Sequence, residues 1–177
     1  MDEQQKNTSG ECSDAGRGKS RITVEMIDQA IADLYRYQSV MDAYSSIPRS
    51  YGPGFQMTEV EAHTLGYIEK EEGMTSKRLC EITNRSKSTI SHVVKFLEEQ
   101  ELIYKRQNPD NKREYYLYLT EKGKLFSDQH RAYDRLTTYR IIEELKKTCS
   151  EDEITAFLKV MNCRTEIFLD TLKEVKR

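Results

Sequence analysis

The side chains best suited to chemistry lie in one stretch of the sequence, from Met74 to Thr120. This stretch carries nine Lys and Arg against six Asp and Glu, a charge of +3, and the net charge of −2 therefore leaves −5 for the rest of the chain. Short hydroxyl side chains stand beside lysines at its centre, between Ser86 and Lys95. Such groups reach base edges and phosphates. The stretch is therefore a candidate for contact with DNA, although this run of residues is equally compatible with an ordinary solvated helix face.

Other chemistry has little support. The cysteines are far apart and form no CxxC pair, and the histidines form no cluster with a cysteine or with one another in the sequence: Cys12, Cys80, Cys149, Cys163, His63, His92 and His130. We therefore expect no dedicated metal site and no cofactor. The sequence also contains no GxSxG, phosphate-loop or HExxH motif. An enzyme is accordingly not expected.

The candidate residues need helices to position them, and the capping residues predict where those helices begin. Thr58 opens a capping box with Glu61, Thr75 precedes a short helix, and Ser86 precedes the next one. In the helix after Ser86, apolar residues at spacings of three and four form a stripe for the core, namely Ile90, Val93, Val94 and Leu97. The polar residues of this helix fall mainly on its other face.

A hairpin is expected next. The β-prone runs 102–107 and 114–119 flank a turn-rich connection at 108–113, and Arg106, Lys112 and Arg113 place positive charge near its tip. Two helices, a turn and a basic hairpin in this order are typical of a winged helix-turn-helix. We therefore predict a mainly α fold with a small β-hairpin wing.

The flanking segments are expected to be helical and to carry the dimer interface. An amphipathic helix is predicted at 22–46, another follows Thr120, and a last one begins after the capping box of Ser150 and Glu153. The last helix carries a heptad-like apolar stripe that needs a partner surface, although packing within one chain is the alternative. Residues 1–20 are polar and predicted to be disordered. No secretory signal or membrane span is visible, which favours a cytoplasmic protein.

The chain resembles the MarR (multiple antibiotic resistance regulator) family of bacterial transcription regulators from about Ile22 to its C-terminus. The resemblance rests on the runs 87–92, 97–103 and 108–113 and on the sequence Leu-Thr-Glu-Lys-Gly at 119–123, which agree with the family in order and spacing. Two departures are visible: Asn111 replaces the acidic residue usually found two positions before the wing arginine, and the turn at Gln100 and Glu101 lacks the usual glycine.

The resemblance implies a homodimer that binds double-stranded DNA, with Arg113 in the minor groove, acting as a repressor of a pseudo-palindromic operator and relieved by a small-molecule effector. Expected domains are a tail (1–20), an N-terminal dimerisation helix and loop (21–52), a winged helix-turn-helix (53–122, with the helix-turn-helix at about 75–100 and the wing at about 103–119) and C-terminal dimerisation helices (123–177). The DNA-contacting residues are expected to be Ser76, Ser86, Lys87, Ser88, Thr89, Ser91, His92, Lys95, Arg106, Asn108, Lys112 and Arg113. Tyr35, Tyr44 and Tyr51 are candidates for an effector pocket, with core packing as the other role.

Two alternatives stay open. The winged helix could engage another protein instead of DNA, because the charge excess is small. A cysteine thiol could make the protein redox-responsive, which would require an exposed and activated cysteine.

Overall fold

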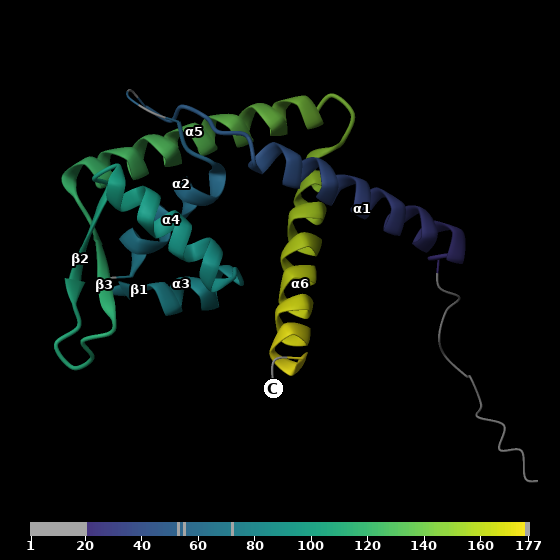
Figure 1. Ribbon diagram of the computed structural model, residues 1–177. Coiled ribbons are helices and arrows are strands. Elements are labelled where there is room, and N and C mark those ends of the chain that lie inside the picture. The colour runs from purple at the N-terminus through teal and green to yellow at the C-terminus, as the bar shows by residue number, and fades with distance from the viewer. Residues whose placement is uncertain (1–20, 53, 55, 72, 176–177) are drawn as a thin grey trace, which may run out of the picture. The chain divides into compact units, whose positions relative to one another are not determined.

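The computed structural model describes residues 21–52, 54, 56–71 and 73–175, so the predicted disorder of residues 1–20 lies outside the described residues. The expected fold class, a winged helix-turn-helix within a mainly α chain, is confirmed (Figure 1). The helices are α1 (Val24–Ser45), α2 (Glu59–Lys70), α3 (Ser76–Thr83), α4 (Lys87–Glu99), α5 (Glu121–Leu145) and α6 (Glu151–Val175). The strands are β1 (Met74–Thr75), β2 (Ile103–Gln107) and β3 (Tyr115–Leu119).

The helix starts follow from local hydrogen bonds. Thr58 and Glu61 form the predicted capping box, and the side chains of Thr75, Ser86 and Thr120 each accept an amide N–H of the first turn that follows. Ser150 and Glu153 bond reciprocally at the start of α6. Each cap satisfies an amide that the helix itself leaves unpaired. All five predicted capping residues are therefore confirmed.

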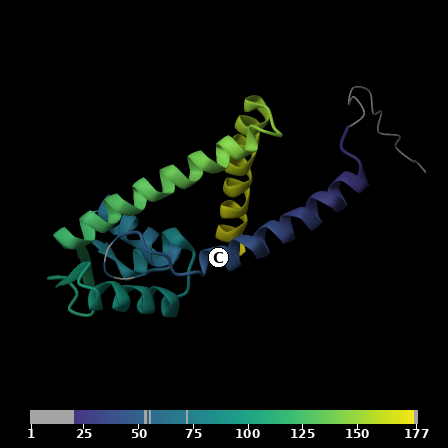
Figure 2. The ribbon, with the colours of Figure 1, turned by 90° about the horizontal axis from the view of Figure 1, so that it is seen from above.

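One core holds α2, α3, α4, the sheet and the first half of α5 together, and we call residues 57–130 the winged domain. The core includes Leu65, Leu79, Leu97, Leu117 and Phe126. The α5 helix packs against α2 and extends beyond the winged domain (Figures 1 and 2). No helix in the described part of the chain combines the length and the apolarity that a membrane span requires.

The sheet has three antiparallel strands in the order β1-β3-β2, one more strand than the predicted hairpin. Ile103 pairs with Leu119 and Lys105 with Leu117 along the wing, and Met74 pairs with Leu117 on the other side. The extra strand has two residues, too few for a periodic pattern to reveal. It ties the start of α3 to the wing.

The chain divides into two units between Tyr44 and Ser45, whereas a boundary after residue 52 was expected. The loop after α1 belongs with the winged domain because Arg49 and Met57 exchange backbone hydrogen bonds and Tyr51 is buried. Residue 123 is no boundary either, since Gly123 and Phe126 are buried. Within their own units, α1 and α6 contain no buried residue.

The first turn of α5 lies directly on the turn between α4 and β2. A Cβ atom on Gly123 would lie 2.0 Å from the carbonyl oxygen of Leu102 and 2.9 Å from its carbonyl carbon. Both are backbone atoms, so a side chain there forces the two segments apart. Only glycine fits this contact.

We therefore expect Gly123→Ala to lower the free energy of unfolding by about 3 kcal/mol, as overpacking of a rigid contact does. Gly66→Ala is the matched control, because a Cβ on Gly66 meets nothing within 4 Å and alanine favours a helix interior. Urea denaturation of the two variants measures the difference. Equal stability of the two variants would contradict the proposed close contact.

The turn at Gln100 and Glu101 is strained because it lacks the usual glycine. Glu101 has a φ of 58°, in the left-handed region, whereas Gln100 has a φ of −83°. A side chain in the left-handed region costs about 1–2 kcal/mol, which glycine avoids.

Glu101→Gly should therefore raise the free energy of unfolding by about 1 kcal/mol. Gln100→Gly should lower the free energy of unfolding by a similar amount. Gln100 is not in the left-handed region, so glycine relieves no strain there, while it increases the conformational freedom of the unfolded chain. Thermal denaturation separates the two cases. Destabilisation by both substitutions would show that the conformation of Glu101 is not a strained one.

Candidate nucleic-acid interface

The polar face of α4 is held outward by its buried face. Ile90, Val93, Val94 and Leu97 are buried as predicted. The N-terminus of the helix is fixed by Ser86, whose Oγ accepts the N–H of Thr89 at 3.1 Å. With one stripe anchored in the core, the helix cannot rotate, and its remaining side chains have a defined direction.

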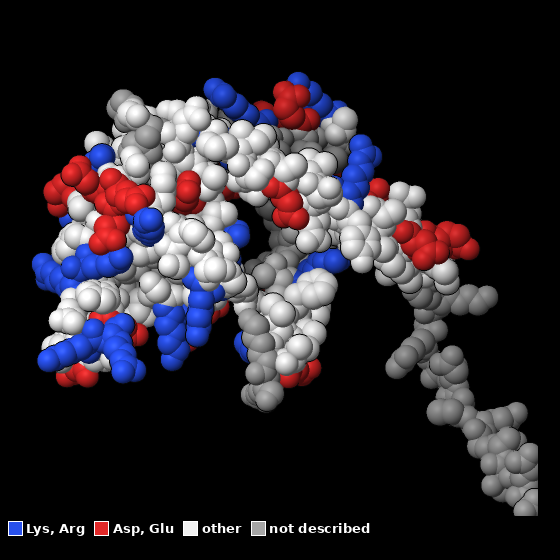
Figure 3. Space-filling view, in the orientation of Figure 1, with Lys and Arg blue, Asp and Glu red and all other residues white. Residues whose placement is uncertain are grey.

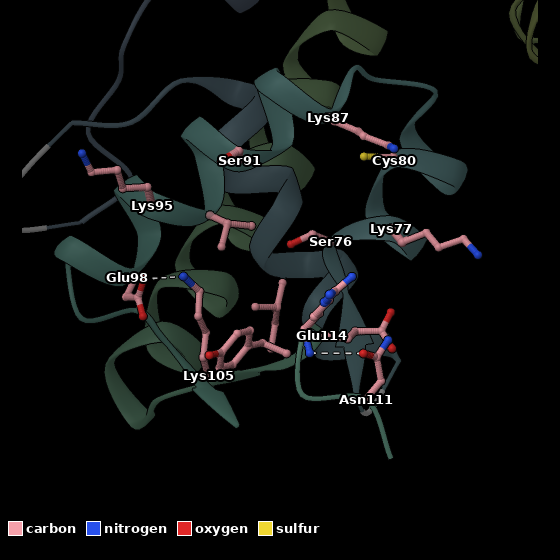
Figure 4. A pocket seen from close by; sticks show the side chains of 14 residues that line it. Ser76, Lys77, Cys80, Lys87, Ser91, Lys95, Glu98, Lys105, Asn111 and Glu114 are labelled. Carbon is pink, nitrogen blue, oxygen red and sulfur yellow. Dashed lines mark hydrogen bonds and ion pairs between the residues drawn. The ribbon is translucent and has the colours of Figure 1, made fainter. Parts of the chain in front are cut away.

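Three of those side chains, Lys87, Ser91 and Lys95, follow one another at single-turn spacing and face a hollow between α3, α4 and the wing (Figure 4). Residues from α3 and from the wing complete this hollow: Ser76, Lys77 and Cys80 from α3, and Lys105, Asn111 and Arg113 from the wing. Five of the predicted DNA-contacting residues are thus brought together: Ser76, Lys87, Ser91, Lys95 and Arg113.

The hollow is positively charged because several of its cations have no acidic partner. Lys105 pairs with Glu98 at 2.6 Å, and Lys95 lies 3.6 Å from Glu99. Among the residues that the structure describes, no carboxylate lies within ion-pair distance of Lys77, Lys87 or Arg113. Figure 3 shows Lys and Arg side chains gathered over the wing and the lower edge of the winged domain. Unpaired cations on one face suit a polyanionic partner.

The wing tip is shaped by Asn108, which was expected to contact DNA. Its side chain is 6% exposed, its Nδ2 donates to Glu114 Oε2 at 3.0 Å, and its Oδ1 accepts the N–H of Asp110 at 2.9 Å. Both polar atoms are thus used inside the loop, so the expectation of a DNA contact was wrong. Asn108 positions the loop instead.

Asn111 supports Arg113 through the backbone. Its Oδ1 accepts the N–H of Arg113 at 3.1 Å, while its own N–H donates to the carbonyl oxygen of Asn108 at 3.3 Å. The amide thus closes the turn without contributing charge. The guanidinium of Arg113 stays exposed at the hollow.

Arg106 lies on the other face of the wing. Residues alternate along β2, and Lys105 faces the hollow, so Arg106 points away from it. Its guanidinium lies 5.3 Å from the ring centre of Tyr104 and 5.1 Å from that of Tyr118, which are stacked on each other. The expected contact of Arg106 with DNA would have to come from the outer face of the wing.

The remaining predicted residues divide by exposure. Ser88, His92 and Lys112 are exposed, Ser88 and His92 on the stripe of α4 next to the hollow. Ser86 and Thr89 are joined by hydroxyl contact at 2.8 Å and hold the helix start. Lys77, which sequence reasoning missed, lines the hollow. Its position next to Ser76, in the first turn of α3, could have identified it in the sequence as a candidate for contact with DNA.

The tyrosines proposed for an effector pocket have different environments. Tyr51 is 6% exposed and packs edge-on against His130 and Tyr133, which confirms core packing for this residue. Tyr35 and Tyr44 are on α1 and are 73% and 40% exposed. An effector pocket formed by these residues stays a prediction.

Two histidines that are far apart in the sequence are neighbours in the structure. The ring centres of His63 on α2 and His130 on α5 are 4.9 Å apart, and Asp134 contacts both. The separation of these histidines along the chain gave no sign of this spatial pair. Only the packing of α2 against α5 brings them together.

The comparisons with known proteins agree with this geometry. Residues 57–115, which comprise α2 to the start of β3, match the model of the MarR family. An uncharacterised helix-turn-helix transcriptional regulator of Bacillus subtilis, YhjH, is 23% identical over 141 residues, covering 77% of this chain and 81% of the relative.

Solved structures share the fold. A MarR family transcription regulator has a TM-score of 0.66 at 23% identity, covering 85% of this chain and 97% of its own. Streptococcus pneumoniae FabT in complex with DNA has a TM-score of 0.60 at 18% identity, covering 84% of this chain and 99% of its own. The family match lies over the helix-turn-helix and most of the wing, and the solved structures show that this chain has the winged helix-turn-helix fold of a MarR family transcription regulator.

Proposed function

We propose that the protein is a homodimeric repressor that binds a pseudo-palindromic operator, inserts α4 into the major groove and places Arg113 in the adjacent minor groove. The observation that carries the proposal is the unpaired positive face formed by Lys77, Lys87 and Arg113 around the exposed hydroxyl of Ser91. Hydroxyls there can read base edges, while the lysines bind phosphates. The target is chromosomal DNA, so we place the protein in the cytoplasm.

The dimer is supported by apolar surface that a single chain leaves uncovered. Phe157, Leu158 and Phe168 on α6 are each more than half exposed. Leu136 and Tyr139, on the part of α5 beyond the winged domain, are 51% and 62% exposed. Large apolar side chains exposed in such number mark an interface. In a two-fold dimer, half-site centres would lie about 10 base pairs apart.

Repression relieved by a small-molecule effector completes the proposal. A dimer bound to the operator blocks transcription. An effector relieves this repression by favouring a dimer conformation in which the two α4 helices no longer fit the half-sites. Selecting fragments of the source genome that bind the purified protein would identify the operator. Failure to bind any duplex above non-specific background at low salt would eliminate the proposal.

Arg113→Ala should weaken binding to the operator about tenfold. It should also make the negative slope of log affinity against log salt concentration less steep by about one. The arginine has no acidic partner in the described chain, so its charge is available to the DNA. Fluorescence anisotropy across a salt series measures both quantities. Lys173→Ala, which removes the same charge from α6, is the control and should change neither. An unchanged salt slope in Arg113→Ala would exclude this arginine from the interface.

Combining Leu158→Glu with Phe168→Glu should convert the dimer to a monomer, because charges would replace the exposed apolar stripe of α6. Light scattering coupled to size-exclusion chromatography measures the mass. Lys159→Glu, on a neighbouring face of the same helix, is the control and should leave the dimer intact. A double variant that remained dimeric would place the interface elsewhere.

A further inference from the structure

We propose that His63, Asp134 and His130 form a binding site for a divalent transition-metal ion, with Zn²⁺ as the best-fitting ion, between α2 and α5. The site lies apart from the positive hollow and none of its residues belongs to the proposed DNA contacts. It does not rest on the proposed function. A metal titration can therefore succeed or fail whatever the outcome of DNA binding.

Two packed helices assemble the donor atoms. The α2 helix supplies His63, while α5 supplies His130 and Asp134, which are one turn apart and therefore project from the same side. Asp134 Oδ2 lies 3.4 Å from His63 Nε2 and 3.4 Å from His130 Nε2. One donor atom from each residue lies within 4.8 Å of the other two.

These distances suit a metal better than a hydrogen bond. Hydrogen bonds between nitrogen and oxygen span about 2.7–3.2 Å, and a separation of 3.4 Å is beyond that range. Zinc bonds imidazole nitrogen and carboxylate oxygen at about 2.0–2.2 Å, which places neighbouring corners of its tetrahedron about 3.3–3.6 Å apart. Asp134 is thus already at ligand distance from both histidines. Only the separation between the two imidazoles must shorten.

The buried histidine supplies an independent observation. The side chain of His130 is 6% exposed, yet its Nε2, which points at Asp134, has no hydrogen-bond partner among the described residues. A buried polar atom without a partner is unfavourable, and a bound ion would satisfy it. Burial lowers the pKa of His130, which keeps the imidazole in the neutral form that binds metals.

The site is open on one side. The side chains of His63 and Asp134 are 46% and 42% exposed, so an ion can enter and a fourth ligand can bind. Glu59, one turn before His63 on α2, has a buried Oε2 without a hydrogen-bond partner among the described residues, and its charge acts on His130. This carboxylate is our candidate for the fourth ligand.

The donor set selects the class of ion. Two imidazoles and one carboxylate suit zinc and its first-row neighbours, whereas calcium and magnesium require oxygen ligands. The competing explanation is a metal-free contact in which Asp134 shares its charge between two histidines. That explanation predicts no ion binding at this place.

The test is a titration of the full chain, without an affinity tag and after treatment with a chelator, with ZnCl₂ in a calorimeter. One ion per chain should bind. His63→Gln and Asp134→Asn should each weaken binding at least about tenfold, since losing even an outer-shell partner has that effect. Both positions are half-exposed, so the variants should fold, and circular dichroism checks this.

The controls separate this site from other ligands. His92→Gln changes an exposed histidine on α4, and Cys149→Ser and Cys163→Ser change the thiols outside the winged domain. All three should bind Zn²⁺ as the unaltered chain does. Absence of a one-to-one titration, or equal affinity in His63→Gln and Asp134→Asn, would overturn the proposal. So would a titration that is lost only in a cysteine variant.

Discussion

The contact between the start of α5 and the turn that follows α4 is the constraint on which the rest of the winged domain depends. Thr120 Oγ1 donates to the carbonyl oxygen of Glu101 at 2.7 Å, Lys122 Nζ donates to that of Gln100 at 2.7 Å, and Gly123 lies against Leu102. The three residues that connect α4 to β2 and the first turn of α5 meet here. These contacts fix the direction of α4 relative to the first turn of α5.

Sequence reasoning succeeded where the cause was local. A hydroxyl residue before an apolar repeat predicts the start of a helix to within a few residues. The spacing of the apolar residues in α4 predicted which face of this helix is buried and which is exposed. It failed where residues distant in the sequence decide the outcome. The strand at Met74 exists because β3 accepts it, and His63 meets His130 because two helices pack. Neither of these contacts leaves a periodic pattern in the chain.

The asparagine at position 111 is an example of a departure that the structure explains. An acidic residue near the wing arginine would hold it by charge and would also neutralise it. Asn111 instead accepts the backbone N–H of Arg113, and Asn108 fixes the remainder of the loop through Glu114 and Asp110. The loop is thus held by backbone bonds and by the amide side chains of Asn108 and Asn111, of which Asn108 also donates to the Glu114 carboxylate. The full charge of Arg113 remains available to a ligand.

The α5 helix runs without interruption from the winged domain to the exposed apolar surface, 25 residues or about 37 Å at 1.5 Å per residue. Its first half is fixed by Gly123, Phe126 and His130, and its second half carries Leu136 and Tyr139. Each residue of a helix advances the direction of the side chains by about 100°. Adding or removing one residue between His130 and Leu136 would therefore turn the apolar surface to a different side of the domain. Homologues should vary in length in the loops and keep the length of this segment constant.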